Sequence, residues 1–410
     1  MTATMTTTTP SPSGLLRLPP EIRDQIYTVL LQPSSNRTFQ RDGYTDYDYS
    51  AALALFRVSR AIYHEARDVF RALNVFVRIE TPWAEAEQHV HLVGHVPILM
   101  KGARAQRFRG HTLQVTIETP AAGEPEHGTH HFVMLADDLP AFTRAWFYWN
   151  LSHPGLNQWL ALSLALRDPH APDWDEPHVR RDVQRSLLLP FGDVKGLHRL
   201  SVSGDPKPQP KIVAELRALQ AQEPRSPEQC LAEGIRLKNE GNELLQKGEY
   251  QAALDVYNRA WEAIHIIVKG RQRHVHAEAF FARDLVDEPF AGKNGQLERM
   301  TLRLQLVANT CLTYMRMGDW HELQFWGMRT IQLMRQATGA NDRHIPPEDE
   351  ALLSFPSATQ VGKIYYRTGR AFQELGDRDE ARRLVRVAQV YLPDDKTVRE
   401  TLASLALKLG

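Results

Sequence analysis

One pattern recurs three times in the C-terminal part of the chain: a turn glycine followed by an amphipathic helix. The copies begin at Gly248 (GEYQAALDVYNRAWEAI), Gly318 (GDWHELQFWGMRTIQL) and Gly376 (GDRDEARRLVRVAQVYLP). Internal repeats of helical units are typical of solenoids, in which each repeat packs only on its neighbours. The repetition therefore predicts a stack of helices over residues 231–410.

Small and aromatic residues in these copies fall on positions that are typical of one repeat family. They are Gly241, Gly248, Tyr250, Ala253, Tyr257 and Ala260 in the first copy and Gly369, Gly376, Ala381, Ala388 and Pro393 in the third. The second copy keeps Gly318 and Trp320 but has Leu323, Gly327 and Thr330 where small or aromatic residues are usual. On these residues the segment resembles the tetratricopeptide repeat family. The resemblance implies an α-solenoid of three repeats followed by a terminal helix.

The spacing of the copies departs from that family. Their turn glycines lie 70 and 58 residues apart, whereas a tetratricopeptide repeat is about 34 residues long. Insertions at 268–296 and 338–357 account for the excess. A solenoid tolerates such loops because each repeat contacts only its neighbours.

Counting back from each turn glycine, the helical segments before the three copies contain five polar residues: Lys238 and Asn242 in the first, Asn309 in the second, and Lys363 and Arg367 in the third. Their types match the carboxylate clamp of large immunophilins and heat-shock organising co-chaperones within the tetratricopeptide family. That clamp holds the C-terminal Glu-Glu-Val-Asp of the cytosolic seventy- and ninety-kilodalton heat-shock chaperones. The resemblance thus implies that these five residues bind a peptide carboxylate.

The helical period supports a clamp independently of the resemblance. Residues four apart lie on the same face of a helix, so Lys238 projects with Asn242, and Lys363 with Arg367. A chain end with a terminal Asp carries two close carboxylates, which cationic and amide donors bind well. Two alternatives remain: a merely solvated helix face, and a groove for an internal acidic motif.

The N-terminal part contains two further helical blocks, LPPEIRDQIYTVLL and LFRVSRAIYHEARDVF, which we expect to pack on one another. They resemble the F-box and related fungal domains over residues 15–80. In the F-box family, apolar side chains near the opening Leu-Pro dock on the Skp-type adaptor of cullin ubiquitin ligases. The resemblance makes Leu18, Pro19, Ile22 and Ile26 interface candidates, with core packing as the alternative. A polar, tyrosine-rich insertion between the blocks departs from a compact F-box.

Composition changes along the rest of the chain. Strand-like alternation at 74–81, 111–119 and 196–204 predicts a small α/β section over 81–205. Five prolines within 206–230 predict a semi-rigid linker and the main domain boundary. Residues 1–14 have neither the basic and apolar regions of a signal peptide nor an Arg-rich transit pattern, and we expect a disordered tail. The fold class is therefore multidomain and mainly α.

Charge and cysteine content exclude several function classes. Lys plus Arg and Asp plus Glu both number 49, which leaves no net field to attract nucleic acid or an anionic membrane. No run approaches the roughly 20 apolar residues that span a bilayer. The two cysteines, Cys230 and Cys311, have no metal-ligand or redox spacing and suit a reducing compartment, the cytoplasm or the nucleus.

No catalytic motif stands out, and we expect neither enzymatic activity nor a cofactor. The sequence has no Gly-rich phosphate loop or nucleophile elbow. In HVHLVGH, a strand would put His89 and His91 on one face, but no carboxylate or cysteine pattern accompanies them, so we predict no metal site. The aromatic run from Trp146 to Trp149 suits either a core or an exposed recognition patch.

These observations predict a protein interaction adaptor. The leading hypothesis is a co-chaperone whose repeats bind the acidic C-terminal tail of a heat-shock chaperone. The alternative is an F-box-type substrate receptor of a cullin ubiquitin ligase, whose repeats recognise another protein. Both functions are compatible in one chain.

Overall fold

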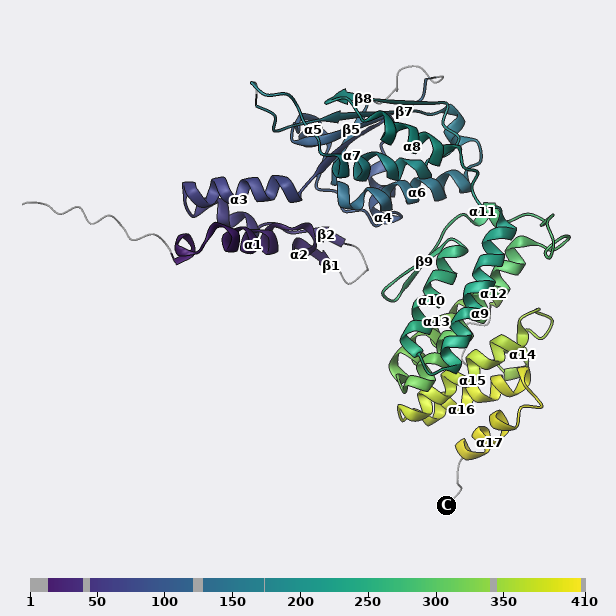
Figure 1. Ribbon diagram of the computed structural model, residues 1–410. Helices are drawn as coiled ribbons and strands as arrows, with labels where there is room; N and C mark the ends of the chain where they lie inside the picture. The colour runs from purple at the N-terminus through teal and green to yellow at the C-terminus, as the bar shows by residue number, and fades with distance from the viewer. Residues whose placement is uncertain (1–13, 40–44, 121–127, 173, 340–344, 407–410) are drawn as a thin grey trace, which may run out of the picture. The chain divides into compact units, whose positions relative to one another are not determined.

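The chain forms a mainly helical structure with a central mixed sheet (Figure 1). The computed structural model describes residues 14–39, 45–120, 128–172, 174–339 and 345–406. Residues 1–13 of the expected N-terminal tail lie outside the described residues, and Gly14 already begins a 3-10 turn. The chain divides into two compact units, Met1–Pro224 and Arg225–Gly410, hereafter unit 1 and unit 2.

Unit 1 combines an N-terminal helical region with a sheet and its covering helices. Its elements are η1 (Gly14–Arg17), α1 (Pro20–Leu31), α2 (Pro33–Asn36), β1 (Arg37–Phe39), β2 (Thr45–Tyr47), η2 (Ala52–Arg57), α3 (Arg60–Leu73), β3 (Phe76–Thr81), α4 (Ala86–Leu92), β4 (Met100–Lys101), α5 (Gly102–Arg107), β5 (His111–Glu118), β6 (His130–Leu135), η3 (Ala136–Asp138), α6 (Leu139–Ser152), η4 (Leu156–Trp159), β7 (Ala161–Arg167), α7 (Arg181–Leu188), η5 (Leu189–Asp193), β8 (Arg199–Asp205) and α8 (Pro210–Ala221).

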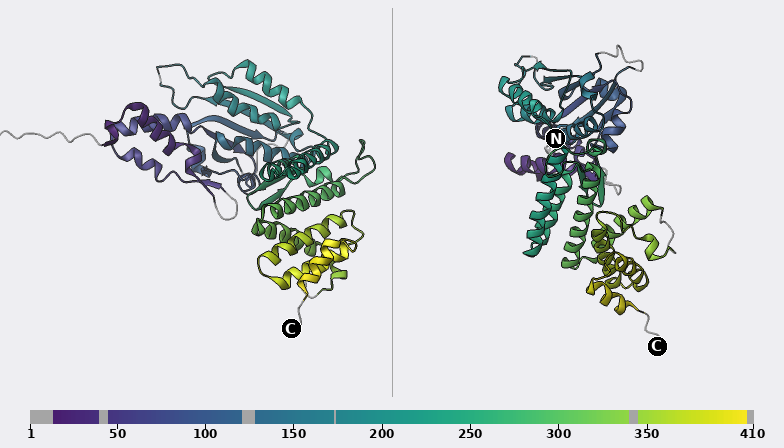
Figure 2. Two further views of the ribbon diagram at one scale, coloured as in Figure 1. Left: turned by 60° about the horizontal axis from the view of Figure 1, so that its bottom comes forward. Right: turned by 90° about the vertical axis from the view of Figure 1, so that its right-hand side faces the viewer.

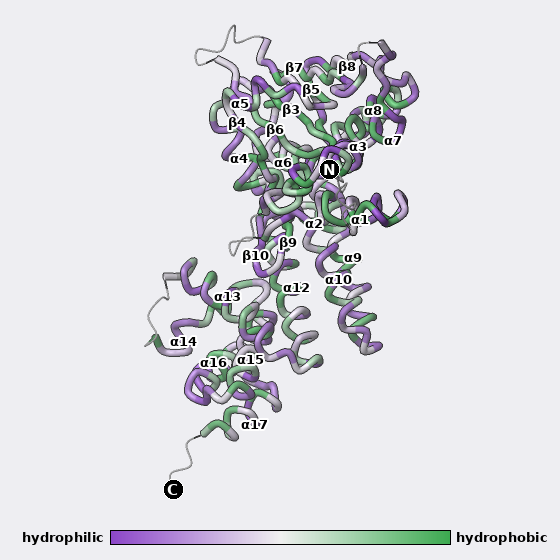
Figure 3. Tube along the Cα trace, turned by 90° about the vertical axis from the view of Figure 1, so that its left-hand side faces the viewer, coloured by the Kyte–Doolittle hydropathy of each residue, from purple (hydrophilic) through white to green (hydrophobic). Residues whose placement is uncertain are grey.

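The six-stranded sheet has the order β4-β6-β3-β5-β7-β8. The pairs β3/β5 and β7/β8 are parallel and the other neighbours are antiparallel. Alternation decides which side chains are buried: in β5, Leu113, Val115 and Ile117 point into the core. Hydrophobic residues recur along these strands in the hydropathy-coloured trace (Figure 3). The strands predicted at 74–81, 111–119 and 196–204 are confirmed as β3, β5 and β8.

Two predicted domain limits are wrong. The limit at residue 80 falls inside β3, an interior strand of the sheet, so the helical region and the α/β section belong to one unit. The linker predicted over 206–230 contains α8, whose Ile212 and Leu216 are buried in the core of the sheet. Pro210 is the first residue of α8 and Pro227 the first of α9. Proline is favoured at this position because its missing N–H has no helical partner there. The boundary between the units, after Pro224, does lie within the predicted segment.

The N-terminal helices α1 and α3 pack on one another, as predicted. Their shared core contains Tyr27, Leu31, Ala52, Ile62 and Ala66. At the edge of this core the Glu65 carboxylate accepts hydrogen bonds from the Tyr27 hydroxyl at 3.0 Å and the Arg23 guanidinium. Strands β1 and β2 of the polar insertion pair in antiparallel fashion, and Arg37 and Tyr47 join them to the buried carboxylate of Asp138.

Unit 2 is a succession of helix pairs with two inserted segments (Figures 1 and 2). Its elements are α9 (Pro227–Gln246), α10 (Tyr250–Ala263), β9 (Ile266–Lys269), β10 (Gln272–Val275), α11 (Glu278–Phe281), α12 (Gly295–Met317), α13 (Trp320–Thr338), α14 (Pro347–Glu350), α15 (Ala358–Glu374), α16 (Arg378–Tyr391) and α17 (Lys396–Leu405). The pairs α9/α10, α12/α13 and α15/α16 each pack internally, and α12 contacts both α9 and α15.

Both insertions are fixed to the helices by buried charged side chains. Arg299 on α12 is fully buried and donates to the backbone carbonyls of Ile264 (3.0 Å) and His276 (2.8 Å) on either side of the β9–β10 hairpin. Glu350, at the end of α14, accepts hydrogen bonds from Arg335 on α13 and Tyr365 on α15. The inserted segments therefore belong to the packed structure of the unit.

None of the helices in the part of the chain that the structure describes is both long and apolar enough to cross a membrane.

Candidate functional site

The five predicted clamp residues lie on three helices of unit 2 that pack in sequence. Lys238 and Asn242 are on α9, Asn309 is on α12, and Lys363 and Arg367 are on α15. All five side chains are partly exposed. The helix α12 contacts both α9 and α15. Hydrogen bonds join Lys238, Asn242 and Arg367 to residues of α12.

Asn242 is held in one orientation by two hydrogen bonds. Its Oδ1 accepts from Asn309 Nδ2 at 2.6 Å and from the Tyr257 hydroxyl at 2.8 Å. With the oxygen occupied, the two N–H donors of Asn242 Nδ2 have no partner among the described residues. An amide fixed in this way presents donors, which is what a carboxylate ligand requires.

The local sequence explains how Tyr257 reaches Asn242. Tyr257 is almost fully buried on α10, and its ring lies against Gly241 of α9. A Cβ atom at Gly241 would approach Tyr257 Cε1 to 2.4 Å, so only glycine allows this approach of the two helices. The signature residues Gly241 and Tyr257, whose pattern predicts packing, thus also orient the neighbouring amide.

Lys238 and Arg367 are partly desolvated and hydrogen-bonded to neutral groups. Lys238 Nζ donates to Gln305 Oε1 of α12 at 2.9 Å, and Arg367 donates to the backbone carbonyl of Ala308. Burial lowers the pKa of both side chains. Neither these two cations nor Lys363 forms an ion pair with a carboxylate within the described residues. The three side chains therefore leave positive charge uncompensated.

A cavity of about 600 Å³ adjoins the two asparagines. It is lined by Asn242, Leu245, Gln246, Lys247, Gly248, Tyr250, Asn309, Leu312 and Arg316. Arg316 is exposed on α12 and lowers the pKa of Arg367 through charge repulsion, after the larger effect of burial. The cavity therefore adds a cation that the sequence reasoning missed.

A helical spacing could have revealed Arg316. Gln305, Asn309, Leu312 and Arg316 follow one another at intervals of four, three and four residues, which places them on one face of α12. Two of them, Gln305 and Asn309, already bond to predicted clamp residues. Extending the face by two turns from Asn309 leads to Arg316.

The other predicted surface lies at the start of α1 in unit 1 and includes the two residues before the helix. Leu18 is 38% exposed and Ile22 is 41% exposed; Pro19 is exposed and Ile26 is half-buried. None of the four is among the residues that form the core of α1 and α3. Val29 continues the same face and is 59% exposed.

The histidine-rich segment is helical rather than extended. His89 and His91 lie on α4, where residues two apart point in different directions, so the shared strand face does not form. Among the described residues, no group of three or more His, Cys, Asp or Glu side chains is placed to hold a metal ion. The sequence also gathers His127, His130 and His131 in EHGTHH; of these, His127 lies outside the described residues.

Comparison of the chain with family models, curated proteins and solved structures found no match.

Proposed function

We propose that unit 2 is a tetratricopeptide-type α-solenoid that binds the acidic C-terminal tail of a heat-shock chaperone, of the Glu-Glu-Val-Asp kind. In this proposal Lys238, Asn242, Asn309, Lys363 and Arg367 hold the terminal carboxylates, and the protein is a non-catalytic cytoplasmic or nuclear adaptor. The three helix pairs of unit 2 support the repeat assignment.

The observation that carries the proposal is positive charge without a counter-ion beside an oriented amide. Desolvation of Lys238 and Arg367 is unfavourable unless a partner compensates it. Elsewhere in unit 2, cations such as Arg236 and Arg383 do have carboxylate partners. A bound carboxylate would provide the missing partner and would accept the free N–H donors of Asn242.

The chemistry of a chain terminus fits these donors better than an internal acidic residue does. A terminal Asp presents two carboxylates within a few bonds, and the candidate donors come from α9, α12 and α15. One internal carboxylate would leave part of this set unused. Arg offers a planar fork and Lys a point charge, so both shapes of contact are available.

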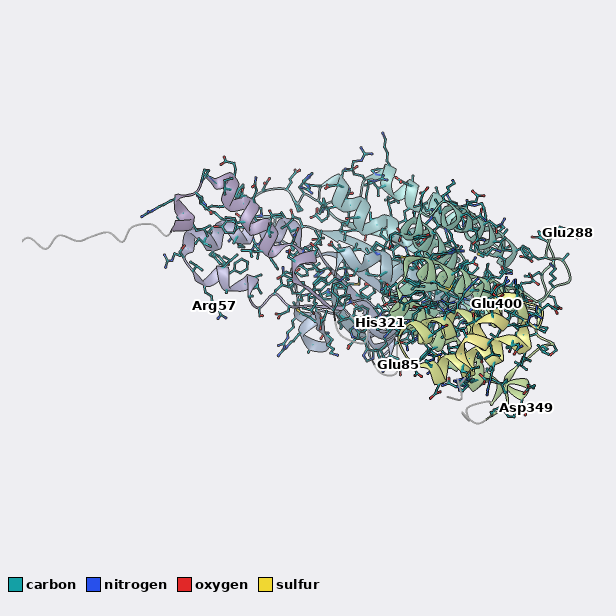
Figure 4. All side chains as sticks on the ribbon, turned by 90° about the horizontal axis from the view of Figure 1, so that it is seen from below. Arg57, Glu85, Glu288, His321, Asp349 and Glu400 are labelled. Atoms are coloured by element: carbon teal, nitrogen blue, oxygen red, sulfur yellow. The ribbon has the colours of Figure 1, made fainter. Side chains whose placement is uncertain are left out.

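The test is calorimetric titration of the full chain with a free-acid peptide that ends in Glu-Glu-Val-Asp. Lys363→Ala should weaken binding on the order of tenfold, because it removes one charge-assisted hydrogen bond. The matched control is Lys396→Ala on α17, whose side chain is 83% exposed and pairs with Glu400, labelled in Figure 4. Equal affinities for the wild type and Lys363→Ala, with both proteins folded, would overturn the clamp.

A second function concerns unit 1, for which we propose an F-box-like module that docks on the Skp-type adaptor of a ubiquitin ligase. The exposed apolar side chains of Leu18, just before α1, and of Ile22 and Val29 on α1 support it, because neighbouring exposed apolar side chains mark interaction surfaces. In this case the repeats would recognise the protein to be modified.

Retention of the purified adaptor by the full chain tests the second function. Ile22→Asp should abolish retention and leave the melting temperature nearly unchanged, since the side chain is exposed. Val286→Asp, at an equally apolar exposed residue of unit 2, is the control. Retention of the adaptor by Ile22→Asp, or no retention by the wild type, would exclude this docking mode.

A further inference from the structure

Unit 1 contains a second cavity that the proposed functions do not use. It has a volume of about 470 Å³, within the size range of small-molecule sites. Its walls come from strands β3, β5 and β6, from α4 and α6, and from residues that follow α6. The lining is mainly apolar, and we call this cavity the aromatic pocket.

Three indole rings, those of Trp83, Trp146 and Trp149, and the rings of Phe132 and Phe142 line the aromatic pocket. Trp146 is fixed in place, because its indole N–H donates to Asn157 Oδ1 at 2.9 Å and its ring is buried. With that polar atom satisfied, Trp146 offers only its apolar ring to the pocket. Flat apolar surfaces of this kind favour flat aromatic ligands.

The Trp149 ring contacts two imidazole rings. The His89 ring meets it edge-on with centroids 4.1 Å apart, and the His153 ring stacks on it at 4.4 Å. Trp149 is 39% exposed and therefore lies where the pocket meets solvent. The sequence left open whether the aromatic run of α6 fills a core or forms a recognition surface. In the structure, Trp146 of this aromatic run is buried and Trp149 is partly exposed.

One polar atom of the pocket lining lacks a partner. His89 Nε2 is buried and has no hydrogen bond within the described residues. Burial lowers the pKa of His89, and the neighbouring His153 lowers it further, which favours the neutral imidazole. Thr81 Oγ1 already accepts from the backbone N–H of Trp83. His89 Nε2 is therefore a buried atom of a lining residue with unmet hydrogen-bonding capacity, and a turn of the imidazole would bring it to the cavity.

The charge of the lining restricts the ligand. The carboxylate of the pocket belongs to Glu85, which is exposed just before α4 and labelled in Figure 4. A neutral imidazole gives an anion no counter-charge, and Glu85 would repel it. A cation would have to leave water for a largely apolar cavity. An uncharged ligand avoids both costs.

We infer that the aromatic pocket binds an uncharged, planar aromatic molecule with one hydroxyl group, whose rings lie against the indoles and whose hydroxyl bonds to His89 Nε2 after the imidazole turns toward the cavity. The apolar walls supply most of the affinity, and the single hydrogen bond selects hydroxylated over plain ring systems.

Equilibrium dialysis of the full chain against three probes of one ring system tests this inference. The probes are 2-naphthol, naphthalene and 2-naphthoate. We expect saturable binding of 2-naphthol, binding of naphthalene weaker by about fivefold because it lacks the hydrogen bond, and weaker binding of the anionic naphthoate. Choline serves as a cationic fourth probe. No saturable binding of 2-naphthol, or tighter binding of naphthoate or of choline, would overturn the inference.

Variants locate the bound probe. Ala145→Phe should fill the pocket and Trp149→Ala should remove part of its wall, and each should weaken 2-naphthol binding by about tenfold. Trp149 is partly exposed, so we expect Trp149→Ala to fold, and it still tests the assignment if Ala145→Phe does not fold. His89→Leu should abolish the preference for 2-naphthol over naphthalene. Trp159→Ala, at a 63% exposed indole outside the pocket lining, is the control. Unchanged 2-naphthol affinity in a folded Trp149→Ala variant would contradict the assignment.

Discussion

Tyr257→Phe tests whether the orientation of Asn242 matters for peptide binding. The substitution removes the hydroxyl that donates to Asn242 Oδ1 at 2.8 Å and leaves the buried ring in place against Gly241. Asn242 lies at the edge of a cavity, where water can replace the lost donor, so no buried acceptor is stranded. The expected cost to the free energy of unfolding is therefore the net value of one neutral hydrogen bond, about 1 kcal/mol.

The same variant should also weaken peptide binding. With only Asn309 bonded to its oxygen, the Asn242 amide can turn and present its acceptor to the ligand. We expect affinity for the free-acid peptide to fall about threefold, less than the loss of a whole hydrogen bond, since the amide retains one partner. Urea unfolding and calorimetry measure the two effects separately.

A double-mutant cycle with Asn242→Ala isolates the pair. The coupling free energy between Tyr257→Phe and Asn242→Ala should be about 1 kcal/mol for two residues in direct contact. Tyr250→Phe is the matched control, because Tyr250 lines the same cavity and its hydroxyl has no hydrogen-bond partner in the described structure. A coupling of zero, or equal effects of the two Tyr→Phe changes, would refute the role given to Tyr257.

Three further changes test the packing of unit 2. Gly327→Ala should destabilise the chain by about 2 kcal/mol in urea unfolding, because the added Cβ would lie 1.9 Å from Thr368 Oγ1; an unchanged midpoint would refute this close approach of α13 and α15. Glu350→Gln should cost about 3 kcal/mol, because it removes the charge of a buried carboxylate that accepts hydrogen bonds from Arg335 and Tyr365, and a loss below about 0.5 kcal/mol, typical of a surface site, would contradict it. Burial and the nearby charge of Arg299 lower the pKa of His265 to about 3. The unfolded state therefore binds the extra proton, and stability falls as pH drops from about 6.5 towards 3, by at most about 1.4 kcal/mol per pH unit. Asn tolerates the positive φ of His265, so His265→Asn should lessen this dependence, and an identical pH profile would exclude His265 as its source.

Periodicity was enough to predict the helices of unit 2 and the spacing of its polar residues, because both depend on neighbours within one helix. Hydrogen bonds between helices depend on distances that the sequence does not contain. The support that Tyr257 gives Asn242 and the proximity of Arg316 to Arg367 are of this kind. The carbonyl partner of Arg367 also lies 59 residues away in sequence.

Two features of unit 1 could not be predicted from the sequence, each for a physical reason. A proline is read as a linker signal, although the first turn of a helix accommodates it equally well, as Pro210 does in α8. Helical spacing identifies the apolar positions of α1 but cannot tell which of them face a partner helix. Tyr27 and Leu31 fill the core, while Ile22 and Val29 on the same helix are exposed.

The central claim is that unit 2 recognises a free chain terminus. Titration of the full chain with a Glu-Glu-Val-Asp peptide as the free acid, and with the same peptide amidated at its C-terminus, tests it most directly. Amidation removes one carboxylate and its charge-assisted hydrogen bonds, so affinity should fall on the order of tenfold or more. Equal affinity for the two peptides would contradict the account.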